Sequence, residues 1–199
     1  MSNVVSETTR RRTVRLSATA AIWALCYAAY RGYYAAGGTY GLAGVIRPGS
    51  EGEFRLINLA GAVVIAAIAL FPVAALPLWS RRRGRSVLLA VCWLLAVGLT
   101  MHALVDMVER MLSLAGAVDI EYPSLWASVD RRADDLHDLL GNEPWFLSQG
   151  LLLGALAWIQ LGPGRGRRRW VVTAGAATAA LTLLGIVTMT GGVGRVIVG

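Results

Sequence analysis

The side chains that could do chemistry in this sequence are few, and three of them lie together. His102, Asp106 and Glu109 lie at and just beyond the end of an apolar run that begins near residue 87. Their spacing of three and four residues places all three on one face of a helix. An imidazole beside a carboxylate is the pairing that general acid–base catalysis uses. These three are therefore the candidate catalytic residues, and a hydrogen-bonded packing histidine is the alternative role for His102.

A second group lies on an earlier apolar run, where an arginine is flanked by aromatic residues. Arg31 stands among three tyrosines that share one helix face, Tyr27, Tyr30 and Tyr34. Arg31 lies as deep in its run as His102 does in the later one. Asp106 is then one helical turn further out and within reach of a long arginine side chain. The sequence therefore predicts an ion pair between Arg31 and Asp106.

Two amides extend this polar layer. Asn58 and Gln149 stand at the start of two further apolar runs and reach the same depth. With Arg31 and the three tyrosines they are the predicted ligand-binding residues. Structural pairing that locks helices together is the alternative. An ion or proton pathway is disfavoured, because the other half of these runs carries almost no polar residue.

A third cluster, Asp134, His137 and Asp138, lies in the polar connection 117–143. Carboxylates and an imidazole are ligands for divalent metals. No second histidine lies nearby, however, and a solvated acidic helix face accounts for the same pattern. We therefore expect no metal and no cofactor, and these three residues are weak metal candidates.

The composition indicates which elements must position these groups. The chain has 199 residues, of which 56% are hydrophobic and 16% charged, whereas a soluble domain carries about 25% charge. Five apolar runs approach the length of about 20 residues that crosses a bilayer as a helix: 16–36, 56–79, 87–105, 144–161 and 170–189. We predict an all-α integral membrane protein, with a basic tail at 1–15 and a single five-helix transmembrane domain at 16–199.

The charge pattern predicts the orientation of this bundle. The net charge is +7, every basic residue is arginine, and three arginine clusters occupy residues 10–15, 81–85 and 165–169. Because basic loops stay in the cytoplasm, the N-terminus is expected inside and the C-terminus outside a bacterial cytoplasmic membrane. The clusters are short turns without interleaved aromatic residues, so we expect lipid head groups as their partners and no nucleic acid.

The outer connection 117–143 reads as an amphipathic helix that begins at Pro123. Leu125, Val129, Leu136 and Leu140 would lie on one face of it, with aspartates opposite. Apolar positions also continue past residue 105, which predicts that the third helix extends to about Leu114.

Two segments carry resemblances. Residues 23–38, WALCYAAYRGYYAAGG, resemble the first helix of small actinobacterial multi-pass membrane proteins of unassigned function, which implies a membrane location and no particular activity. His102-x-x-x-Asp106, followed by an acid-rich segment with a tryptophan, resembles the membrane sterol-isomerase family. That resemblance implies acid–base residues inside a helix bundle. Asp106 stands where that family has Glu, and Gln149 stands where another acid is expected.

Three functions follow from these patterns. The first is a membrane protein whose outward-facing polar pocket binds a lipid-like ligand or a partner subunit. The second is a small intramembrane isomerase-like enzyme, in which His102 and Asp106 act on an amphiphilic substrate held by Arg31 and the tyrosines. The third is a transport component. The first is favoured because the sequence carries no complete catalytic constellation.

Overall fold

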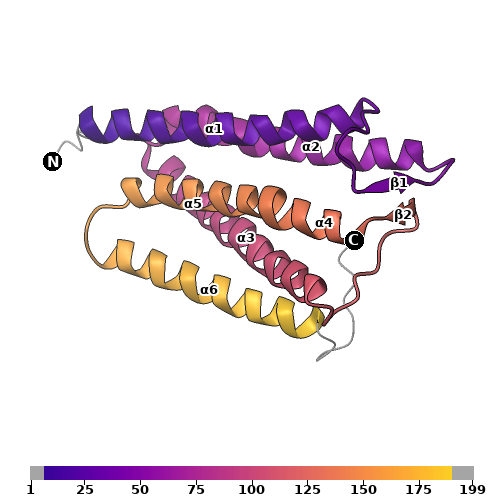
Figure 1. The fold of residues 1–199 in the computed structure, drawn as a ribbon. Helices are drawn as coiled ribbons and strands as arrows, with labels where there is room; N and C mark the ends of the chain where they lie inside the picture. The colour runs from indigo at the N-terminus through magenta and orange to yellow at the C-terminus, as the bar shows by residue number, and fades with distance from the viewer. Residues whose placement is uncertain (1–6, 190–199) are drawn as a thin grey trace.

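The computed structural model describes residues 7–189, apart from the side chain of Arg82, and it is a bundle of five long helices (Figure 1). These helices are α1 (Glu7–Ala35), α2 (Glu51–Ala74), α3 (Arg82–Leu114), α5 (Glu143–Gln160) and α6 (Arg165–Met189). Each corresponds to one predicted apolar run, and α3 continues to Leu114 as expected. The helical fold class is therefore confirmed.

The helices pack in an order that differs from their order in the chain. α1 packs against α2 and α5, while α3 packs against α5 and α6. The central helix is α5, whose Leu153, Leu156 and Ala157 are completely buried. α5 therefore lies between α1 and α3, and this arrangement decides which polar residues can meet.

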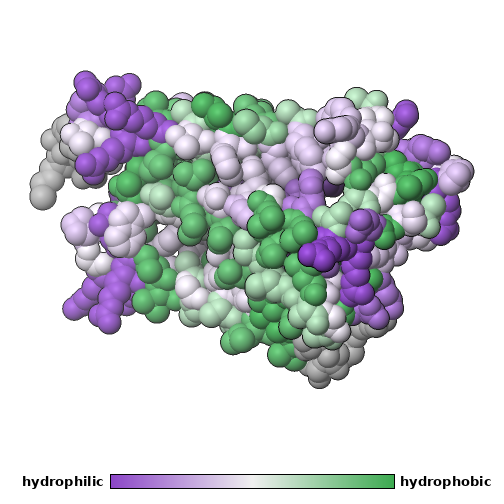
Figure 2. Space-filling model, viewed as in Figure 1, coloured by the Kyte–Doolittle hydropathy of each residue, from purple (hydrophilic) through white to green (hydrophobic). Residues whose placement is uncertain are grey.

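Three of the helices are long and apolar enough to cross a membrane: α2, α3 from Arg83 onward, and α6. α1 carries the tyrosines and Arg31, and α5 carries Glu143, Gln149 and Gln160, which lower the hydropathy of these two helices. α1 and α5 pack against each other, and several of their polar side chains are buried, among them Ser17, Gln149 and Gln160. Figure 2 shows hydrophilic residues gathered at two opposite ends of the molecule, with a largely apolar surface between them.

The first turns of α3 and α6, which carry two of the arginine clusters, lie at the same end of the bundle as the start of α1 (Figure 1). These clusters therefore belong to helices and are not the predicted short turns. α2 ends at Ala74, before the predicted end of its run at residue 79. Pro77 follows in the 3-10 turn η1 (Leu76–Leu78), and a proline there cannot supply the N–H that would continue the α-helix. Gly84, in the first turn of α3, packs closely against this turn, because a Cβ at that position would lie 2.7 Å from the carbonyl oxygen of Leu78.

At the opposite end, the predicted amphipathic helix from Pro123 is wrong in its extent. β2 (Trp126–Val129) instead pairs antiparallel with β1 (Gly44–Ile46). The helix α4 begins only at Arg131 and ends at His137, and the π-helical turn η2 (Asp138–Asn142) joins it to α5.

Two local features explain this outcome. The Asp130 side chain accepts a hydrogen bond from the backbone N–H of Ala133 at 3.1 Å and so caps the start of α4. Gly44 lets the two strands approach, because a Cβ there would lie 2.7 Å from the carbonyl oxygen of Ser128. The pairing with a distant strand thus overrides the helical apolar pattern of residues 125–129.

Candidate functional site

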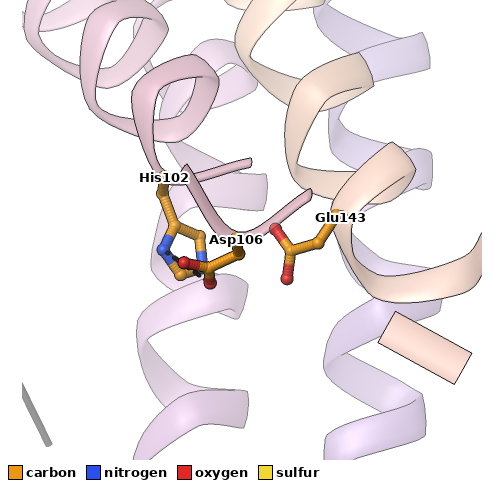
Figure 3. A group of neighbouring side chains, drawn as sticks. All are labelled: His102, Asp106 and Glu143. Atoms are coloured by element: carbon orange, nitrogen blue, oxygen red, sulfur yellow. Dashed lines mark ion pairs between the residues drawn. The ribbon is translucent and has the colours of Figure 1, made fainter. Parts of the chain in front are cut away.

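The most concentrated group of chemically capable side chains lies where α3 meets the start of α5 (Figure 3). His102 and Asp106 lie one turn apart on α3, with His102 Nδ1 3.3 Å from Asp106 Oδ2. Glu143 is the first residue of α5 and points toward them. One ligand atom from each of the three residues lies within 4.8 Å of the others. We call these three residues the outer polar site.

The site combines a buried carboxylate with an accessible imidazole. Glu143 is only 4% exposed, and its Oε2 is buried without a hydrogen-bond partner in the part of the chain that the structure describes. The side chain of His102 is 45% exposed. A buried carboxylate oxygen without a partner is unfavourable, so a cation reaching the site past His102 would find an unsatisfied ligand.

A close crossing of α3 and α5 positions the outer polar site. A Cβ at Gly150 would lie 2.6 Å from Thr100 Oγ1 and 3.2 Å from the carbonyl oxygen of Ala96. Only glycine permits this approach of the two helices without a shift. Phe146, on the same helix as Gly150, packs edge-on against the His102 ring at a centroid distance of 4.7 Å. The backbone contact and this ring contact together hold His102 beside the start of α5.

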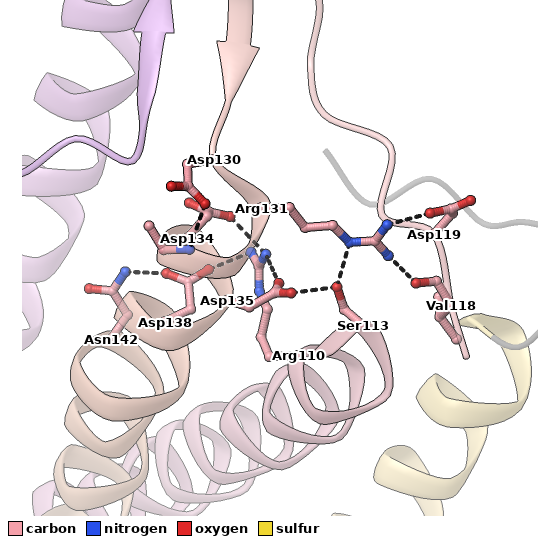
Figure 4. A network of polar contacts seen from close by, with 11 residues as sticks. Arg110, Ser113, Val118, Asp119, Asp130, Arg131, Asp134, Asp135, Asp138 and Asn142 are labelled. Carbon is pink, nitrogen blue, oxygen red and sulfur yellow. Dashed lines mark hydrogen bonds and ion pairs between the residues drawn. The ribbon is translucent and has the colours of Figure 1, made fainter. Parts of the chain in front are cut away.

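Arg110, which also lies on α3, pairs with carboxylates outside the outer polar site (Figure 4). Arg110 Nη1 lies 2.8 Å from Asp134 and 3.1 Å from Asp135, and its Nη2 pairs with Asp138. Asp135 is 1% exposed and accepts a further hydrogen bond from Ser113. Arg110 therefore forms its direct ion pairs with these three carboxylates and not with Asp106 or Glu143.

This arginine network attaches the outer connection to the end of α3. Arg131 donates to Ser113 Oγ at 2.9 Å and also pairs with Asp119 (Figure 4). Burial raises the pKa of Asp134 above its ordinary value, although the Arg110 guanidinium acts in the opposite direction. Burial, helped by the nearby Asp134 charge, also raises the pKa of Tyr122 to about 12. These contacts therefore hold the connection between α3 and α5 against the end of α3.

The predicted tyrosine stripe is a packing surface between α1, α5 and the connection before α5. Tyr27 stacks on Trp145 with ring centroids 4.3 Å apart, and its hydroxyl donates to Asn142 Oδ1 at 3.0 Å. The Tyr30 hydroxyl lies 2.8 Å from His137 Nε2. Tyr34 is 3% exposed and packs against Phe54. Tyr27, Tyr30 and Tyr34 therefore all take part in contacts between elements of the bundle.

The structure does not form the predicted Arg31–Asp106 ion pair. α5 lies between the helices that carry these residues, and Asp106 pairs with His102 instead. The Arg31 guanidinium lies over Gly61 of α2, where Arg31 Nε is 3.2 Å from the position that a Cβ would take. Similar depth along two helices therefore did not make them neighbours.

The remaining predicted residues are distributed over several places. Asn58 is buried and donates to the Phe54 carbonyl at 2.9 Å. Gln149 is completely buried, and both of its amide atoms lack a partner within residues 7–189. Glu109 is half-buried and lies outside the group formed by His102, Asp106 and Glu143. The outer polar site therefore retains two of the three candidate catalytic residues.

The weak metal candidates form contacts outside the outer polar site. Glu143, which was not predicted, is the third residue of that site. Asp134 and Asp138 pair with Arg110, and His137 contacts Tyr30. Glu143 lies far from Asp106 in the sequence, and neither spacing nor a motif connects the two. The available signal was an acidic residue directly before Pro144, at the start of an apolar run.

The opposite half of the bundle is closed by apolar packing. One cluster of buried residues joins the end of α2 with α3 and α5: Ala75, Trp79, Leu88, Cys92, Leu156 and Ala157. One of the polar contacts near this end is a hydrogen bond of 2.6 Å from Gln160 to Thr13. Fully buried leucines at 153 and 156 separate this contact from Gln149. This packing gives no support to a polar pathway through the bundle.

Comparisons of this chain with models of protein families, with curated proteins and with solved structures find no match.

Proposed function

We propose that the chain is a multi-pass protein of a bacterial cytoplasmic membrane with five spans, its N-terminus inside and its C-terminus outside. The alternating direction of the five helices and the position of the arginine clusters at one end support this topology. α1 and α5 are less apolar than the other three helices. Many of their polar side chains are buried between neighbouring helices. Both helices could therefore cross the membrane without exposing these side chains to lipid.

We propose that this protein binds a positively charged ligand at the outer polar site, which opens on the outer side of the membrane. The observation that carries this proposal is the buried Glu143 carboxylate, which lies beside Asp106 and His102 and has one oxygen without a partner among the described residues. Two carboxylates at close range repel each other and attract a cation. The ligand is then a cation or the amine head group of an amphiphile.

An acid–base enzyme is the second candidate, and the 3.3 Å contact between His102 and Asp106 favours it. A carboxylate that holds an imidazole in one orientation is a common acid–base arrangement. In this alternative, Glu143 would be the second acid, and the substrate would approach past the exposed His102. The tyrosines would not hold the substrate, because they are engaged in helix packing.

Ligand-dependent stability of the purified protein tests the proposal. We expect a divalent cation or an amphiphilic amine to raise the unfolding temperature, because a ligand at 100 times its Kd stabilises the folded state by about 2.7 kcal/mol. Glu143→Gln is expected to lose this response, whereas Glu53→Gln, at an exposed acid in the first turn of α2 outside the site, is expected to keep it. The proposal is wrong if no positively charged ligand stabilises the protein, or if Glu143→Gln responds as the unmodified chain does.

A further inference from the structure

We infer that the positively charged ligand of the outer polar site is a first-row divalent metal ion held by His102, Asp106 and Glu143. This inference rests on the proposed function and narrows it. One imidazole nitrogen and two carboxylate oxygens form a ligand set that suits Zn²⁺ and Mn²⁺. Ca²⁺ and Mg²⁺ prefer sites built only from oxygen, so the histidine favours the transition metals.

The distances on α3 already suit such an ion. Bonds of about 2.1 Å to a tetrahedral metal place neighbouring ligand atoms roughly 3.4 Å apart. His102 Nδ1 and Asp106 Oδ2 are 3.3 Å apart, because residues separated by four positions lie above one another on a helix. One face of α3 therefore presents two ligand atoms at the required separation.

Glu143 supplies the third ligand atom from a different helix. Ligand atoms from all three residues lie within 4.8 Å of one another, so closing the site around an ion needs a shift of at most roughly 1.4 Å at the Glu143 side chain. The Gly150 crossing fixes the distance between α3 and α5, and Phe146 supports the His102 ring. The ion would therefore bridge two helices whose backbones are already held at the necessary distance.

The burial of Glu143 provides an independent indication of a ligand. Its Oε2 has no hydrogen-bond partner among the described residues, and the residue is 4% exposed. Coordination of an ion would satisfy this oxygen. Arg110, a possible competing cation, is paired with three other carboxylates. The exposed side of His102 leaves room for water on the remaining coordination positions.

Metal titration of the full-length protein in detergent, after removal of metals with a chelator, tests this inference. We expect one Mn²⁺ or Zn²⁺ ion to bind per chain. Asp106→Asn and Glu143→Gln should each weaken binding by about 100-fold or more, since even the loss of groups around a metal's ligands costs 10–100-fold. The control Glu53→Gln should stay within about twofold, because Glu53 is an exposed acid in the first turn of α2, outside the group.

A spectroscopic readout identifies the ligands independently of affinity. Pulsed electron paramagnetic resonance of the Mn²⁺-loaded protein should show coupling to an imidazole nitrogen, and His102→Ala should abolish that coupling. His137→Ala is the control, because His137 contacts Tyr30 and lies outside the site. Glu143→Asp keeps a carboxylate and should bind metal more tightly than Glu143→Gln, which gives a second comparison if the glutamine variant folds poorly.

The outcomes separate this inference from the proposed function. If no divalent metal binds, or if Glu53→Gln loses as much affinity as Glu143→Gln, the metal site is wrong. If an amphiphilic amine alone stabilises the protein through Glu143, the metal inference fails and the proposed function stands. If neither ligand class acts through Glu143, both fail.

Discussion

Replacing Arg110 by alanine is expected to destabilise the protein by about 3–5 kcal/mol, because it leaves buried carboxylates without their partner. Arg110 bridges Asp134, Asp135 and Asp138, and Asp135 is 1% exposed. Once the guanidinium is removed, the remaining neutral donor to Asp135 is Ser113. The attachment of the outer connection to α3 should weaken with it.

Chemical unfolding of the purified protein in mixed micelles measures this effect. Arg132→Ala is the matched control, because Arg132 is exposed and lies in α4, the short helix that also carries Asp134 and Asp135. This substitution should lower the free energy of unfolding by less than about 1 kcal/mol. A double variant, Arg110→Ala with Asp135→Asn, should recover part of the loss, since the buried charge is removed. Equal effects of the Arg110 and Arg132 substitutions would contradict the importance of this network.

Replacing Trp145 by alanine is expected to cost about 3–5 kcal/mol, as for other buried aromatic residues cut back to alanine. The ring stacks on Tyr27 and packs edge-on against Phe146. Its indole N–H donates to the Trp23 carbonyl at 3.0 Å, and the Trp23 indole donates back to the Trp145 carbonyl at 3.3 Å. The substitution therefore removes both stacking and one of the two reciprocal hydrogen bonds between α1 and α5.

Trp158→Ala serves as the comparison, because Trp158 lies on the same helix but is 43% exposed. Its ring lies under the Arg167 guanidinium at 4.0 Å, a contact that contributes about 0.5–1 kcal/mol when exposed. Trp145→Phe should have an intermediate effect, since it keeps a stacking ring and loses the indole donor. If the two alanine variants unfold at the same denaturant concentration, the proposed role of Trp145 in joining α1 to α5 is wrong.

The sequence predicted where the long helices lie along the chain, but it did not predict which helices pack against each other. Apolar runs and their periodicity indicated every long helix, including the extension of α3 to Leu114, because these signals are local. The Arg31–Asp106 pair failed because depth along a helix says nothing of which helices touch, and α5 separates α1 from α3. The strand at Trp126–Val129 was missed because its partner, Gly44–Ile46, lies far away in the sequence.

For the same reason, the sequence predicted two of the three residues of the outer polar site and missed the third. His102 and Asp106 could be paired from the sequence because four residues on a helix bring side chains together. Glu143 joins them through the crossing at Gly150, where the helices approach closely enough to exclude a side chain. Gln149, which was expected in a ligand pocket, is instead completely buried in α5.

The central claim is that the outer polar site faces the outside of the membrane, and side-specific labelling tests it most directly. Leu140 is 74% exposed and precedes Glu143 by one helical turn, while Ser80 is exposed beside the arginine cluster at 81–85. Single cysteines would be introduced as Leu140→Cys or Ser80→Cys after replacement of Cys26 and Cys92. In intact cells, a membrane-impermeant maleimide should label the first variant and leave the second unlabelled until the membrane is permeabilised. Labelling of Ser80→Cys but not Leu140→Cys in intact cells would contradict the account.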